Sequence, residues 1–401
     1  MALTLSLPVS EGAPLAPYTL RGTVFAQPPR VAFDRIAYSA AHVVADPLAA
    51  RDPWVDAAID WDATIAYRQH LWSLGLGVAE AMDTAQRGMG LDWPTSLELI
   101  RRSLDAARDV PGAQVASGCG TDHLAPEDAT SVDDVIRAYE EQMAAIEQLG
   151  GRIILMASRA LTRVARSPDD YIRVYGRLLE QAREPVILHW LGDMFDPGLA
   201  GYWGTNDLDQ ATRTALHIIE AHADKVNGIK ISLLDAQREI DMRRRLPTHG
   251  GNDGQGVRMY TGDDFNYAQL IAGDAHGDHP RHGRSDALLG IFDAIAPVAS
   301  AALGELAQGN TERFHALMGP TVPLSRHIFQ APTRFYKTGI VFMAWLNGHQ
   351  DHFTMVGAQQ GARSMLHLAE LFRLADQAGL LTKPDLAVRR MRSLLALHGI
   401  E

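Results

Sequence analysis

The feature that most constrains the fold of this chain is an alternation of short apolar runs with longer amphipathic stretches, from about residue 17 to residue 320. Each apolar run has the length of a buried strand, and each amphipathic stretch has the spacing of a helix. This alternation indicates parallel strands joined by helical crossovers. The eight apolar runs are Leu20–Phe25, Gly77–Thr84, Gln114–Cys119, Arg152–Ala157, Val186–Trp190, Gly228–Ser232, Val257–Thr261 and Leu288–Phe292.

Helix-start signals support the intervening helices. Pro94 is a first-turn proline for the segment Trp93–Asp109. Ser131 with Asp134 forms a capping box that begins Val132–Leu149. Eight strand–helix alternations in about 300 residues predict a closed (β/α)8 TIM barrel. An open doubly wound sheet would carry a glycine-rich fingerprint after its first strand, and the sequence has none there.

After about residue 330 only helical periodicity remains. It predicts three helices, at Arg334–Asn347, Ala362–Ala378 and Asp385–Leu397. We therefore predict an α/β chain in which residues 1–330 form the barrel catalytic domain. Residues 331–401 are predicted to be additional C-terminal helices that pack on the barrel.

Composition excludes several classes of partner. The net charge is −11 and no long Lys/Arg block occurs, which argues against nucleic acid and anionic membranes. No apolar run reaches the ~18 residues that a bilayer span needs. The first 18 residues lack the pattern of a secretory signal. The single cysteine, Cys119, excludes an internal disulfide and suits a reducing compartment, so we expect a cytoplasmic protein that acts on a small molecule.

One apolar run contains a lysine, Lys230, between two isoleucines. Lysine is almost never fully buried unless it is paired or used. Burial disfavours the charged amine, lowers its pKa and makes it a nucleophile near neutral pH. Lys230 is therefore a candidate for imine formation with a carbonyl substrate. Strand alternation would place Gly228 and Ser232 on the same inward face, with Gly228 leaving room beside the amine. The alternative is an ion pair with a barrel carboxylate, or a side chain that reaches solvent.

His189 lies in the preceding strand-like run, between Leu188 and Trp190. If it faces inward, it could carry protons to and from a carbinolamine at Lys230. The alternative is a core histidine that is hydrogen-bonded to a neighbouring strand. We expect the hydroxyl groups of Thr84 and Ser232 to assist in catalysis.

Polar side chains cluster where the predicted strands end, and this is where barrel enzymes place their sites. Carboxylates and imidazoles there could bind substrate hydroxyls or a divalent metal, or they could cap helices. The pair Asp263-Asp264 especially resembles a cap. Arg87 and Arg159 could hold an anionic group bidentately, with surface pairing as the alternative. The residues that we assign to substrate binding are Asp83, Arg87, Asp122, His123, Ser158 and Asp263.

The tract Asp274–His282 resembles a metal-binding segment by composition. It lies between a predicted helix and the eighth predicted strand, and so at the barrel face opposite the site. We predict a solvated loop there.

Three segments carry a resemblance to a known family. Gly228–Lys230, the turn Thr261–Asp264 and the segment Ala287–Ala302 are similar in order and spacing to the dihydrodipicolinate synthase and N-acetylneuraminate lyase superfamily of class I aldolases. The chain resembles a bacterial, dihydrodipicolinate synthase-like branch over about residues 17–381. The resemblance implies a (β/α)8 barrel with C-terminal helices, an imine-forming Lys230, and a homodimer or homotetramer. The imine route itself needs no cofactor.

The chain departs from the family pattern at three strand ends. The family's fifth strand ends in a proton-relaying tyrosine, and the matching residue here is His189. A Gly-Thr-Thr turn that holds a 2-oxo acid carboxylate is replaced by Asp83–Ala85, and a paired tyrosine motif is replaced by Ala157–Arg159. A carboxylate at Asp83 would repel a 2-oxo acid by about one to a few kcal/mol.

The leading hypothesis is a Schiff-base lyase that acts on a polyhydroxylated keto compound by retro-aldol cleavage, aldol addition or dehydration. Dihydrodipicolinate synthesis is not expected. The first alternative is a divalent-metal-dependent sugar lyase, epimerase or isomerase, in which Lys230 would stabilise charge. The second is a non-catalytic barrel that binds a sugar-like ligand.

Overall fold

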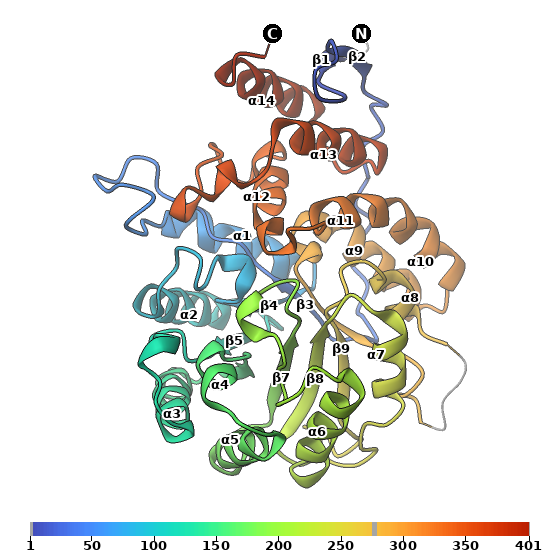
Figure 1. Cartoon of the computed structure of the whole chain (residues 1–401). Coiled ribbons are helices and arrows are strands. Elements are labelled where there is room, and N and C mark those ends of the chain that lie inside the picture. Colours follow the sequence, from blue (N-terminus) through green and yellow to red (C-terminus); the bar gives the residue numbers. More distant parts are fainter. Residues whose placement is uncertain (1–2, 275–278, 401) are drawn as a thin grey trace.

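The computed structural model describes residues 3–274 and 279–400, and within them eight parallel strands close into a barrel with helices around it (Figure 1). The predicted (β/α)8 fold is confirmed. Around the barrel, the strands are β3 (Ala37–Ala40), β4 (Gly77–Glu80), β5 (Val115–Cys119), β6 (Arg152–Leu155), β7 (Val186–Leu191), β8 (Val226–Ser232), β9 (Arg258–Thr261) and β10 (Asp286–Leu289).

The first barrel strand is not the predicted one. The prediction placed it at Leu20–Phe25, but Arg21–Val24 is exposed and forms no strand. The first barrel strand is β3, in which all four residues are buried. Alanine and serine have weak intrinsic strand preference, so this run gives little signal, although neighbours cover it on both faces. The other seven predicted runs overlap barrel strands.

Side chains alternate between the inside and the outside of the barrel along each strand. One buried apolar cluster fills the interior, and a separate, larger one lies between strands and helices. On β8, Ile229 and Ile231 belong to the outer cluster, as the alternation predicts. The interior cluster consists of Tyr38, Ala40, Ala79, Met82, Ala116, Ile154, Met156, Ile187, Tyr260 and Leu288.

The surrounding helices begin close to the predicted capping residues. Asp92 caps the helix that contains Pro94, and Ser131 with Asp134 forms the predicted capping box. A short helix, α4 (Arg159–Val164), follows β6. The other surrounding helices are α1 (Trp61–Ser73), α2 (Trp93–Arg108), α3 (Val132–Gln148), α5 (Pro168–Gln181), α6 (Leu208–Ala221), α7 (Ala236–Arg243), α8 (Tyr267–Ala272) and α9 (Ile291–Ala307).

The chain continues through a helical C-terminal part. It consists of α10 (Thr311–Met318), α11 (Val322–Ile328), α12 (Tyr336–Leu346), α13 (Met365–Gln377) and α14 (Pro384–Leu397), of which the last three were predicted. Figure 1 shows α12 above the strand ends of the barrel. The start of α12 contacts η1 (Asp83–Ala85), the 3-10 turn after β4. The C-terminal part therefore contributes to the mouth of the barrel.

The N-terminal residues pack against the C-terminal helices. The hairpin β1 (Thr4–Leu7) and β2 (Ala16–Thr19) lies beside α13 and α14 (Figure 1). The Tyr18 hydroxyl donates to Asp376 at 2.7 Å, and Arg392 donates to the Thr4 carbonyl at 2.5 Å. The domain boundary at residue 330 stays a prediction.

One predicted segment is only partly described. Residues 275–278 of the Asp274–His282 tract lie outside the described residues, so the solvated loop stays a prediction. Among the helices of residues 3–274 and 279–400, none combines the length and apolar character needed to cross a bilayer.

Candidate active site

Lys230 lies inside the barrel, on β8, with His189 of β7 and Tyr260 of β9 as its register neighbours. The residue is 7% exposed. Within the described chain, its amine makes no hydrogen bond and no ion pair within 4.0 Å. Burial lowers its pKa, while the charges of Asp264 and Asp83 act in the opposite direction. The amine is therefore sheltered from water without being held by a carboxylate.

A glycine directly after the next strand makes room for this side chain. A Cβ atom at Gly262 would lie 2.8 Å from Lys230 Cε and 2.3 Å from Ser232 Oγ, so no larger residue fits. Gly228 was expected to leave room beside the Lys230 amine, but it makes room for another side chain. A Cβ atom there would lie 2.6 Å from the ring of Tyr260, so the room at Gly228 is filled by an interior tyrosine.

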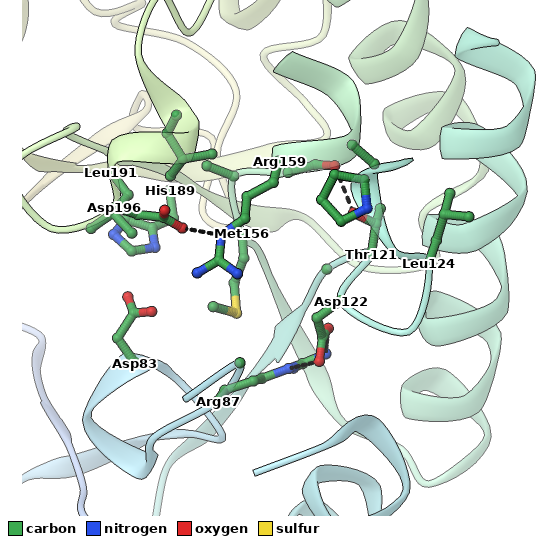
Figure 2. Close-up of a pocket in the computed structure, with 17 residues that line it drawn as sticks. Asp83, Arg87, Thr121, Asp122, Leu124, Met156, Arg159, His189, Leu191 and Asp196 are labelled. Atoms are coloured by element: carbon green, nitrogen blue, oxygen red, sulfur yellow. Dashed lines mark hydrogen bonds and ion pairs between the residues drawn. The ribbon is translucent and has the colours of Figure 1, made fainter. Parts of the chain in front are cut away.

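Two neighbouring spaces lie at the C-terminal ends of the strands. The inner space surrounds Lys230 and has a volume of about 10 Å³, close to the ~10–15 Å³ that one water needs. The outer pocket has a volume of about 200 Å³ and is shown in Figure 2. Asp83 and Leu191 line both spaces, so they lie at the boundary between them. The polar residues of the inner space are Asp83, Thr84, Lys230, Ser232, Asp264 and Tyr336.

Asp264 is, with Asp83, one of the two acidic residues that line the inner space, whereas its sequence pattern resembled a helix cap. One carboxylate oxygen accepts a hydrogen bond from the Ile291 amide at 2.9 Å, which fixes the side chain. Burial raises its pKa to about 7, against the Ile291 amide and the Lys230 charge. The raised pKa of this acid and the lowered pKa of the Lys230 amine both follow from burial in the same space.

Replacing Asp264 with asparagine is expected to lower the pKa of Lys230 further, because the carboxylate that favours the charged amine is removed. Since only the uncharged amine attacks a carbonyl, the pH midpoint for Lys230 modification should move downward. The pH dependence of reductive trapping measures this midpoint. Asp263→Asn is the matched control and should leave the midpoint in place; an unchanged midpoint in Asp264→Asn contradicts the assignment.

Tyr336, at the start of α12, lines the inner space and is a candidate site residue that was not predicted from the sequence. Its hydroxyl lies 2.8 Å from Thr84 Oγ1, and both groups line the inner space. Burial raises the tyrosine pKa well above 10, and the nearby Asp83 charge adds to this. The phenol therefore stays protonated. The two hydrogen-bonded hydroxyl groups of Tyr336 and Thr84 can accept a proton from one partner and donate a proton to another, and the pair stays uncharged.

His189 lines the outer pocket, so it has the inward orientation on which its proposed role depends. Its Nε2 lies 3.3 Å from Ser232 Oγ, and its Nδ1 is buried with no hydrogen-bond partner among the described residues. Burial, with a smaller contribution from Lys230, lowers its pKa well below 6.5. The imidazole is therefore neutral at pH 7 and can act as a base or as a hydrogen-bond partner.

The outer pocket brings together Asp83, Arg87, Asp122 and Ser158 from the predicted binding set. Arg87 is paired with Asp122 at 2.6 Å, and its other N–H groups donate to the Ala81 and Gly118 carbonyls and to Gln142. Ser158 caps α4 and lies 2.6 Å from Thr121. Figure 2 shows the Asp83 carboxylate pointing into the pocket.

Two predicted binding residues lie outside both spaces. His123 lies 2.8 Å from Gln142 and 3.3 Å from Glu141, and Asp263 accepts the Phe265 and Asn266 amides at 2.9 and 3.0 Å. These contacts satisfy the hydrogen-bonding groups of both side chains, so His123 and Asp263 are not part of the proposed site. Across residues 3–274 and 279–400, no three His, Cys, Asp or Glu side chains are arranged to hold a metal ion.

Comparisons with solved structures agree on the fold. The 4-hydroxy-tetrahydrodipicolinate synthase from Methylacidiphilum fumariolicum SolV is similar with a TM-score of 0.61 and 13% identity, over 89% of this chain and 99% of the other. YagE, an E. coli K12 prophage protein of the dihydrodipicolinic acid synthase family solved with pyruvate, is similar with a TM-score of 0.60 and 13% identity, over 92% and 100%. Dihydrodipicolinate synthase from Aquifex aeolicus is similar with a TM-score of 0.58 and 10% identity, over 91% and 98%.

Sequence comparison assigns the family. Among curated proteins, no sequence matches significantly. A family model described as "Protein of unknown function (DUF993)" matches residues 5–400. The chain therefore belongs to the DUF993 family, and it has the barrel fold of the dihydrodipicolinate synthase family.

Proposed function

We propose that this protein is a Schiff-base-forming lyase of the class I aldolase type, with Lys230 as the nucleophile. The observation that carries the proposal is the environment of the Lys230 amine. It is buried, has a lowered pKa and no partner within the described chain, and lines a small space that shares two lining residues with the outer pocket. An amine in this state is suited to attack a carbonyl carbon.

The reaction begins when the amine nitrogen bonds to the carbonyl carbon and the oxygen takes a proton. Loss of that oxygen as water gives an iminium ion. In C–C cleavage the iminium accepts the electron pair of the breaking bond as an enamine; in dehydration a base removes the α-proton, the C–H electron pair forms the enamine, and the β-hydroxyl group leaves with its own pair and a proton as water. Protonation and hydrolysis then release the product. Tyr336 with Thr84, and His189 with Ser232, are the two pairs that we assign to proton transfer, because each reaches the space around the amine.

Asp83 defines the type of substrate that fits next to the reacting carbon. Its carboxylate has no hydrogen bond or ion pair within the described residues and lies at the boundary between the two spaces. An anion beside the carbonyl would meet this charge, whereas hydroxyl groups would donate hydrogen bonds to it. We therefore propose a hydroxylated carbonyl compound, which need not be a 2-oxo acid.

The test is a panel of carbonyl compounds reduced with borohydride, comparing pyruvate with dihydroxyacetone in wild type and Asp83→Asn. We expect wild type to favour dihydroxyacetone, and Asp83→Asn to improve trapping of pyruvate by about tenfold, because repulsion of one to a few kcal/mol is removed. Preference for pyruvate in the wild type would contradict the substrate proposal. Saturable ligand binding without any adduct would indicate a non-catalytic barrel.

The compartment and assembly remain parts of the proposal. Cys119 is buried and unpaired, which is compatible with a reducing cytoplasm. A homodimer or homotetramer follows from the family resemblance and is to be tested by light scattering.

A further inference from the structure

Arg159 carries unused hydrogen-bond donors into the outer pocket. Its Nε donates to Asp196 at 2.5 Å, and its two terminal nitrogens have no partner within the described residues. Figure 2 shows the guanidinium group pointing into the pocket between Asp83 and Arg87. Arg87, in contrast, has its donors committed to Asp122 and neighbouring groups. Arg159 is thus the pocket arginine with free donors.

The Arg159 side chain is half-exposed, and it is held by one ion pair and by close packing against two glycines. Its ion-pair partner Asp196 is itself held by the Gly198 amide at 3.0 Å. A Cβ atom at Gly198 would lie 3.2 Å from Arg159 Cγ, and one at Gly88 would lie 3.9 Å from Arg159 Nη1. The side chain therefore reaches across the pocket from one wall to the other. The backbone before it is anchored as well, because the Ser158 amide donates to the Tyr202 hydroxyl at 3.1 Å.

The inner and outer ends of the pocket carry side chains of opposite charge. Asp83 lies at the boundary with the space around Lys230, where it repels anions, and Arg159 lies in the outer pocket with its terminal donors free. A planar guanidinium with two free nitrogens matches the geometry of a carboxylate or a phosphate. An anionic group on the substrate is therefore favoured at the outer end only.

We propose that the substrate of this site carries a terminal anion, a carboxylate or a phosphate, at the end of the molecule away from the reacting carbonyl, and that Arg159 binds it. The proposal rests on the proposed function for the placement of the carbonyl. The pocket volume of about 200 Å³ lies below the ~300–1,000 Å³ of sites for drug-sized ligands. The substrate is therefore a short-chain hydroxylated aldehyde or ketone with one acidic end.

The test compares matched pairs of aldehydes by reductive trapping with cyanoborohydride and mass mapping. Glyceraldehyde 3-phosphate is paired with glyceraldehyde, and succinic semialdehyde with butanal. In wild type, the anionic member should reach half-maximal trapping at a concentration at least about tenfold lower, as expected for charge-assisted hydrogen bonds. Arg159→Gln should lose this advantage, and Arg159→Lys should keep part of it. Arg163→Gln is the matched control and should behave as wild type, because Arg163 lies on the same helix and is exposed like Arg159 but lines neither space.

A second measurement does not depend on imine formation. Binding of inorganic phosphate to wild type and to Arg159→Gln is titrated to saturation, with the rise in melting temperature as the signal. Equal trapping of both members of each pair, or an anionic advantage that survives in Arg159→Gln, overturns the anion site and leaves Lys230 chemistry intact. If no probe modifies Lys230 but phosphate saturates only when Arg159 is present, the anion site stands and the lyase proposal fails. Absence of both effects rejects both proposals.

Discussion

Replacing Lys230 with methionine should abolish adduct formation at that strand and lower turnover by about a thousandfold or more, as loss of a covalent nucleophile does in other enzymes. Methionine has a similar length and no amine, so it fills the space beside Gly262 without a new charge. The variant should remain folded, because a buried amine contributes no hydrogen bond there within the described chain. Steady-state turnover, intact-mass analysis after borohydride and the melting temperature measure these effects.

Two other lysines serve as controls for this substitution. Lys383 is exposed, and Lys383→Met should behave as wild type. Lys337 is the rival nucleophile, because it is buried beside Tyr336 and burial lowers its pKa to about 8. Its amine, however, donates to the Arg334 carbonyl at 3.0 Å and lines neither space. Turnover that survives in Lys230→Met and disappears in Lys337→Met would transfer the nucleophilic role to α12.

Removing the hydroxyl of Tyr336 should have the second-largest effect. Tyr336→Phe keeps the ring that closes the inner space but leaves Thr84 without its proton-transfer partner. We expect turnover to fall by about 10²–10⁴-fold, the usual contribution of general acid–base catalysis. The concentration for half-maximal trapping at Lys230 should change little, since the amine is untouched. Single-turnover kinetics separates the slowed proton steps from binding.

The matched control is Tyr267→Phe, which removes another buried tyrosine hydroxyl, bonded to Thr321 at 2.5 Å, away from both spaces. It should affect stability more than turnover. The double variant Tyr336→Phe with Thr84→Val should be no slower than the more severe single variant, because the two hydroxyls act as a unit. Additive losses would show that they act separately.

Much of the barrel was predictable because its signal is local. The two-residue period of β8 put Lys230, Ser232 and the isoleucines on the faces that they occupy, and the family resemblance pointed to the same lysine. The first strand was not predicted because Ala37–Ala40 lacks the β-branched residues that are typical of a strand, and because its burial comes from elements distant in the sequence.

The inner wall of the site was harder to predict, because it depends on contacts between distant segments. Tyr336 and Thr84 are 252 residues apart, and no local pattern indicates that a C-terminal helix lies over the barrel mouth. Asp263 and Asp264 lie in a turn, where alternation does not decide which one faces the cavity. Arg87 and Arg159 look equivalent in sequence, and only the tertiary partners of Arg87 show that its donors are used.

The most direct test of the central claim is peptide mass mapping of the wild-type protein after borohydride reduction with a hydroxylated carbonyl compound such as glyceraldehyde 3-phosphate. Reduction converts an imine into a stable secondary amine, so the modified residue keeps the carbon skeleton of the probe. The predicted result is a single adduct on the peptide that contains Lys230, with its yield rising as pH increases through the lowered pKa of that amine. An adduct on any other lysine, or none with any carbonyl compound tested, would contradict the account.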